Sequence, residues 1–143
     1  MLRIFYIVML MIIAYEDYKY KKIPDRSVLI IAGLGILSAV SSNEIQIGKR
    51  FLGMFLAFLI FFIILIFKPE SFGGGDIKLS MALGFYMGPE RWLNSFMIAV
   101  CMAAVYILFQ FLKKKAEWEK EIAFGPFLCM GALIIHVLSI VDY

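Results

Sequence analysis

Residues 51–67, FLGMFLAFLIFFIILIF, form the most apolar run of the chain and contain no charged residue. A helix needs about 20 residues to cross a bilayer, with about 17 as the lower end of the range. The whole chain of 143 residues is 63% hydrophobic and only 17% charged. A soluble domain of this size leaves too much surface in water to hide so many apolar side chains. The composition therefore predicts an all-α integral membrane protein with one domain, residues 1–143, embedded in a lipid bilayer.

Five other apolar runs flank this segment, which predicts about six transmembrane helices in total. No small-residue cleavage site follows the first run, so it is interpreted as an uncleaved helix rather than a signal peptide. The shorter runs span the bilayer only if polar flanking residues are drawn in. We therefore expect the first helix to continue to about Tyr20, with Asp17 near the interface, and Asp76 to start the fourth helix. The five runs are 2–14, 28–40, 77–88, 92–112 and 122–141.

The basic residues predict the orientation of these helices. With six helices, one set of loops contains ten Lys and Arg residues and the opposite set contains four: Arg3, Lys49, Arg50 and Arg91. The positive-inside rule places the richer set in the cytoplasm and both termini outside. Asp17 and Asp76 then lie at the same cytoplasmic face. Because the basic residues sit at segment ends and the net charge is only +3, no nucleic-acid partner is expected.

The stretch SFGGGDIKLS, residues 71–80, places an acid at the start of an apolar segment. Acids held at membrane depth face protein or a water-filled cleft. Gly73, Gly74 and Gly75 lack a Cβ, so the backbone there can bend and an extended substrate can approach it closely. The alternative is a plain loop in which Asp76 only caps the fourth helix.

Asp17 is the preferred partner for Asp76. Pro24 ends any helix before Asp25, so Asp25 is interpreted as a cap of the second helix, whereas Asp17 lies on the extension of the first. Two adjacent carboxyl groups tend to share one proton, so one can act as base toward water while the other donates to a carbonyl oxygen. This division of roles suits peptide hydrolysis and requires neither a metal nor a cofactor. Cys101 and Cys129 form no CxxC pair, so no zinc site is expected.

The combination of these motifs resembles the type IV prepilin peptidase family of GxGD intramembrane aspartic proteases. The matching pattern is an Asp, five residues and Ile-Pro, followed downstream by GxGDxK: Asp17, Ile23, Pro24, Gly73, Gly75, Asp76 and Lys78. The segment FGPFL, residues 124–128, resembles the C-terminal helix segment of the family, although Ala123 stands where Pro often precedes it.

The resemblance implies a catalytic pair, Asp17 and Asp76, and a plasma-membrane (inner-membrane) enzyme whose active site faces the cytoplasm. The implied substrate is a pilin-like precursor with a short basic leader, cut before its hydrophobic helix. Longer family members carry an N-terminal segment with two CxxC pairs that methylates the new pilin terminus. The chain resembles the short, peptidase-only form.

Other residues have two interpretations each. Lys78 either supports the acids or binds substrate, or it is an interfacial lysine. Gly125 and Pro126 either open space beside the site or kink the last helix. His136 is interpreted as a satisfied buried histidine, far from the acids, and residues 113–121 as a solvated cytoplasmic loop.

Three rival functions stay open. The chain could be a small channel or transporter that uses two intramembrane acids for a cation or proton. It could be a protease of the presenilin kind, although Glu16 separates Tyr15 from Asp17 and the chain is short for that helix count. It could also be an inactive assembly scaffold.

Overall fold

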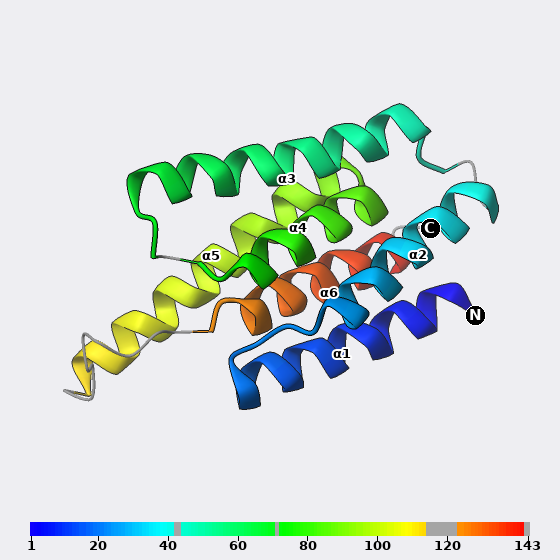
Figure 1. Ribbon diagram of the computed structural model, residues 1–143. Helices are drawn as coiled ribbons and strands as arrows, with labels where there is room; N and C mark the ends of the chain where they lie inside the picture. Colours follow the sequence, from blue (N-terminus) through cyan, green and yellow to red (C-terminus); the bar gives the residue numbers. More distant parts are fainter. Residues whose placement is uncertain (42–43, 71, 114–122, 142–143) are drawn as a thin grey trace.

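The computed structural model describes residues 1–41, 44–70, 72–113 and 123–141, and these contain six α-helices and no strand (Figure 1). The predicted all-α class with six helices is thus confirmed for the described residues. The helices are α1 (Leu2–Tyr20), α2 (Asp25–Ser41), α3 (Ile47–Phe67), α4 (Gly74–Met87), α5 (Pro89–Leu112) and α6 (Gly125–Val141).

The helix ends differ from the apolar runs because polar and special residues determine them. α1 continues through Tyr20 as expected, and Lys21 then adopts a left-handed conformation whose N–H bonds to the Asp17 carbonyl oxygen at 2.8 Å. α5 begins at Pro89, at a first-turn position that suits proline. α6 begins at Gly125, later than the apolar run at 122, while α2, α3 and α4 each begin earlier than their runs.

Successive helices run in opposite directions, so α1, α3 and α5 begin at one end of the bundle (Figure 1). The short α4 lies inside: it packs against α2 and α3, while α6 packs against α1 and α5. Gly53 of α3 and Gly84 of α4 are the point of closest approach. A Cβ on either glycine would collide with the backbone carbonyl of the other, so only glycine permits this crossing.

Two helices, α3 and α5, are long and apolar enough to cross a membrane by length and composition. α6 is a shorter apolar helix of 17 residues. α3 buries only Arg50, Gly53, Ala57 and Phe61 and leaves large apolar side chains exposed along the rest of its length. Exposed apolar surface of this extent marks contact with lipid or with other protein.

Candidate functional site

A pocket of about 690 Å³ opens at the end of the bundle where α1 ends and α4 begins. Both Asp17 and Asp76 line this pocket, so the structure brings the two predicted acids together. Three segments build its wall, namely the last turns of α1, the link to α2 and the start of α4: Glu16, Asp17, Tyr20, Lys21, Lys22, Ile23, Pro24, Asp25, Gly73, Gly74, Gly75, Asp76 and Lys78.

Asp17 lies in the last turn of α1 and its side chain is only 5% exposed. Its carboxylate packs directly onto Gly125, where a Cβ would collide with Oδ2 and lie 2.8 Å from Cγ. The backbone N–H of Gly125 donates a hydrogen bond to the carboxylate. Because Gly125 is the first residue of α6, the carboxylate also lies at the positive end of a helix dipole.

Asp76 is the third residue of α4 and is partly buried. Gly73 is the N-cap residue, so the alternative interpretation of Asp76 as the N-cap is wrong. The Asp76 carboxyl group accepts a hydrogen bond from the backbone N–H of Gly73 at the start of this helix. This carboxyl group is close enough to Asp17 to interact with it electrostatically. The thiol of Cys129, one turn after Gly125 on α6, is also buried.

One oxygen of each acid is buried without a hydrogen-bond partner among the described residues: Oδ2 of Asp17 and Oδ1 of Asp76. Buried carboxylate oxygens are nearly always satisfied, so an unpaired one at a pocket wall indicates a place for water or a ligand. Two such oxygens in one pocket can share a proton and bind a water molecule between them. In the described parts of the chain, no three His, Cys, Asp or Glu side chains are arranged to hold a metal ion.

Ile23 links the two glycine segments of the site. A Cβ on Gly75 would lie 3.1 Å from the Cβ of Ile23, and one on Gly125 would lie 3.2 Å from its Cδ1. Ile23 is itself buried. Ile23 of the sequence motif therefore fills the space between the start of α4 and the start of α6.

Gly73 and Gly74 border open space, since a Cβ on either would meet no other atom within 4 Å. Gly74 and Gly75 belong to the first turn of α4, and Gly73 has ordinary extended dihedral angles. The expected sharp bend is therefore wrong: these glycines do not serve an unusual conformation. What they leave is an uncovered backbone at the pocket.

Lys78 forms an ion pair with Asp25 and not with Asp17 or Asp76. Its Nζ lies 3.0 Å from Oδ1 of Asp25, and both side chains are mostly exposed. Asp25 is the first residue of α2, so this ion pair joins α2 to α4 at the pocket edge. On the neighbouring rim, Ser27 Oγ donates to Glu16 Oε2 at 3.4 Å.

A cluster of aromatic side chains that the sequence analysis missed packs beside the site. Phe61, Phe72 and Phe124 contact one another edge to face, with ring centroids 5.1 to 6.3 Å apart. Phe72 precedes Gly73 and Phe124 precedes Gly125, so the cluster anchors both glycine segments. The available signal was a Phe directly before each glycine motif.

Two other predictions fall elsewhere. His136 is buried, as expected, but its Nε2 has no hydrogen-bond partner among the described residues, so the prediction of a satisfied histidine is wrong. Apart from Lys113, the stretch 113–121 lies outside the described residues.

The sequence is similar to a known protein family and to several known proteins. Residues 4–108 match the sequence model of the type IV leader peptidase family. A prepilin leader peptidase/N-methyltransferase of Pectobacterium carotovorum is 26% identical over 135 residues, covering 91% of this chain and 48% of that protein. The protein of the same name from Bacillus subtilis is 25% identical over 132 residues, covering 92% and 53%. The one from Haemophilus influenzae is 25% identical over 143 residues, covering 96% and 60%.

The chain thus spans about half the length of the curated relatives it matches. No solved structure matches it significantly.

Proposed function

Because the chain belongs to the type IV leader peptidase family, we propose that it is an intramembrane aspartic endopeptidase that removes the leader of pilin-like precursors. Asp17 and Asp76 are the catalytic pair in this proposal. The observation that carries it is the convergence of the two carboxyl groups on one pocket, each with a buried oxygen that no described residue satisfies.

The two acids divide the work of hydrolysis. The ionised member takes a proton from a water molecule held between them, and the protonated member donates its proton to the carbonyl oxygen of the scissile bond. Water then attacks the carbonyl carbon, and the leaving amine receives a proton as the tetrahedral intermediate collapses. The Gly125 amide hydrogen-bonds to Asp17 and fixes the carboxylate in its orientation, while Ile23 packs against Gly125.

The substrate backbone lies along Gly73 and Gly74 in this proposal, because a Cβ on either would meet no atom of the described residues within 4 Å. A helical peptide bond is hydrogen-bonded and shielded, so the substrate helix has to unwind where it is cut. Glycine before the hydrophobic helix of the precursor makes unwinding easy. The pocket of about 690 Å³ lies within the usual range of about 300 to 1,000 Å³ for ligand sites.

All six helices lie within the bilayer in this proposal, with the acid pocket toward the cytoplasm. α4 has 14 residues and is only about 21 Å long, shorter than a hydrocarbon core of about 30 Å. A helix this short, surrounded by longer ones, leaves a depression at one end. That depression admits water and a polar leader to the acids without exposing them to lipid.

The test is cleavage of a purified pilin-like precursor by the purified protein in nanodiscs, followed by mass spectrometry of both products. We expect a cut directly after a glycine that precedes the hydrophobic helix. Asp17→Asn and Asp76→Asn should each lower the rate by about 10²- to 10⁴-fold, while thermal unfolding in detergent stays cooperative.

Asp25→Asn is the matched control, because Asp25 lines the same pocket but is exposed and paired with Lys78. It should retain most activity. Full activity of Asp17→Asn would refute the proposal. A channel or transporter would instead give ion flux in liposomes and an intact precursor.

A further inference from the structure

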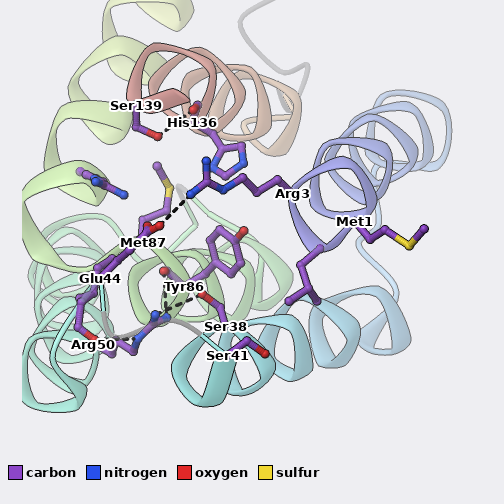
Figure 2. Close-up of a pocket in the computed structure, with 13 residues that line it drawn as sticks. Met1, Arg3, Ser38, Ser41, Glu44, Arg50, Tyr86, Met87, His136 and Ser139 are labelled. Carbon is purple, nitrogen blue, oxygen red and sulfur yellow. Dashed lines mark hydrogen bonds and ion pairs between the residues drawn. The ribbon is translucent and has the colours of Figure 1, made fainter. Parts of the chain in front are cut away.

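A second cavity, of about 270 Å³, lies at the end of the bundle where α1 and α5 begin, opposite the acid pair. Figure 2 shows the residues that line it. Its wall includes Arg3, which lies near the start of α1, about 21 Å along the helix from Asp17. All six helices contribute to the lining: Met1, Leu2, Arg3, Ser38, Ser41, Glu44, Ile45, Arg50, Tyr86, Met87, Arg91, His136 and Ser139.

The described lining residues carry an excess of positive charge. Three guanidinium groups, those of Arg3, Arg50 and Arg91, face a single carboxylate, that of Glu44. Arg3 pairs with Glu44 at 2.7 Å, and Arg91 makes no ion pair with any described residue. Three of the four basic residues that the sequence assigns to this membrane face therefore converge on one cavity.

Arg50 is only 1% exposed, and its hydrogen bonds go to neutral oxygens. It donates to the carbonyl oxygens of Ile45, Gly35 and Tyr86 at 3.2 to 3.3 Å and to Ser38 Oγ at 3.1 Å. Arg50 thus joins α2, α3 and α4 and holds the cavity wall. A buried cation of this kind is stabilised by a nearby anion.

The three arginines lie where the helix dipole disfavours a positive charge. Each lies in the first turn of its helix, where the helix dipole is positive. A cation there costs about 0.3 to 1 kcal/mol, whereas an anion is stabilised. A guanidinium fork binds two oxygens of a phosphate at once; the fork of Arg50 is occupied by its own hydrogen bonds, which leaves those of Arg3 and Arg91 for a phosphate. This arrangement repels cations and attracts a phosphate group.

His136 provides an independent observation. It is only 7% exposed, and its Nε2 is buried without a partner among the described residues. In Figure 2 its ring lies beside the Arg3 side chain, with which it also interacts electrostatically. Such an unsatisfied nitrogen at a cavity wall indicates a missing hydrogen-bond partner. A phosphate oxygen between Arg3, Arg91 and His136 would supply it.

We propose that this cavity binds a phosphate group, supplied by the headgroup of an anionic phospholipid in the outer leaflet or by free phosphate. The cavity volume suits a headgroup phosphate rather than a whole lipid, and large exposed apolar side chains beside it, such as Ile4 and Val40, offer a surface for acyl chains. A bound phosphate neutralises the excess charge and ties the starts of α1 and α5 to α6. This site does not depend on the proposed peptidase activity.

Native mass spectrometry of the full chain tests the lipid source, with phosphatidylglycerol compared with phosphatidylcholine. We expect the unaltered protein to retain phosphatidylglycerol and Arg91→Gln to bind it about tenfold more weakly, as for loss of one charge-assisted hydrogen bond. Lys49→Gln is the matched control: it removes one charge at the same end, but Lys49 does not line the cavity and is 57% exposed. Glu44→Gln should strengthen retention because it removes the opposing charge.

Thermal unfolding in inorganic phosphate, against chloride at equal ionic strength, tests the free-anion source. A phosphate-dependent rise in Tm that Arg91→Gln loses and Lys49→Gln keeps supports the site even without lipid retention. Arg3→Gln replaces Arg91→Gln if the latter does not fold. Equal retention of both lipids with no phosphate effect on Tm overturns the proposal, and so does retention by Arg91→Gln equal to that of Lys49→Gln.

Discussion

Substitution of Gly125 by alanine is the sharpest test of how the acid pair is positioned. The added Cβ would collide with Oδ2 of Asp17 and lie 2.8 Å from its Cγ. Carbon atoms prefer separations of about 3.5 to 4.0 Å, so the carboxyl group has to move by roughly 1 Å. A misplacement of about 1 Å can slow an enzyme about 100-fold, which corresponds to about 2.7 kcal/mol of transition-state stabilisation.

The assay is steady-state cleavage of a pilin-like precursor by the purified variant, measured together with thermal unfolding. We expect kcat to fall about 100-fold with KM little changed, because the substrate-facing backbone at Gly73 and Gly74 is untouched.

Two glycine variants serve as controls for Gly125→Ala. Gly33→Ala makes the same change in α2, where a Cβ meets nothing, and should retain activity and gain about 0.5 to 1 kcal/mol of stability. Gly131 lies in the same helix as Gly125, and Gly131→Ala places a Cβ against the Ser95 carbonyl oxygen of α5. This variant should have lower stability. The reasoning fails if Gly125→Ala cleaves at the normal rate, or if its activity falls only in proportion to lost folded protein, as in Gly131→Ala.

Three further predictions concern the pocket and the far end of the bundle. Gly74→Ala should leave the Tm unchanged, since a Cβ there meets nothing, but should raise KM if the substrate lies on this backbone; an unchanged KM would remove Gly74 from the binding surface. Lys78→Gln should lower the free energy of unfolding by less than about 1 kcal/mol because its ion pair with Asp25 is exposed. A KM increase in Lys78→Gln that Asp25→Asn does not share would assign substrate contact to Lys78 itself. Arg50→Met removes the hydrogen bonds to the Gly35 and Tyr86 carbonyl oxygens of α2 and α4 and should cost at least about 2 kcal/mol, seen as a lower Tm in detergent; an unchanged Tm would contradict the role of Arg50 as a structural link.

The helices and the pairing of the acids were predictable from the sequence for simple reasons. Apolar runs separated by Gly, Pro and charged residues define the helices whatever their packing. An even number of helix crossings returns the chain to the same side, which puts the end of α1 and the start of α4 at the same end of the bundle. The family resemblance then singled out Asp17 and Asp76 as a pair, whereas their meeting in one pocket required the fold.

The packing of individual residues could not be predicted. In a soluble protein the apolar stripe of a helix marks its buried face, but here the exposed faces of the helices are apolar too. α3 buries Arg50, Gly53, Ala57 and Phe61 and exposes most of its large apolar residues, the reverse of a soluble helix. The contact of Gly125 with Asp17 and the ion pair of Lys78 with Asp25, 53 residues apart, depend on helix order in space. Arg3, Arg50 and Arg91 could be counted as an orientation signal, but their meeting at one cavity required the fold.

The way the helices are paired has a consequence for the two acids. Asp17 belongs to α1, which packs against α6. Asp76 belongs to α4, which packs against α2 and crosses α3 closely at Gly53 and Gly84. Each carboxyl group thus belongs to a different half of the molecule. Any movement of one half against the other therefore changes the gap between the two carboxyl groups, and the packing between the halves sets their spacing.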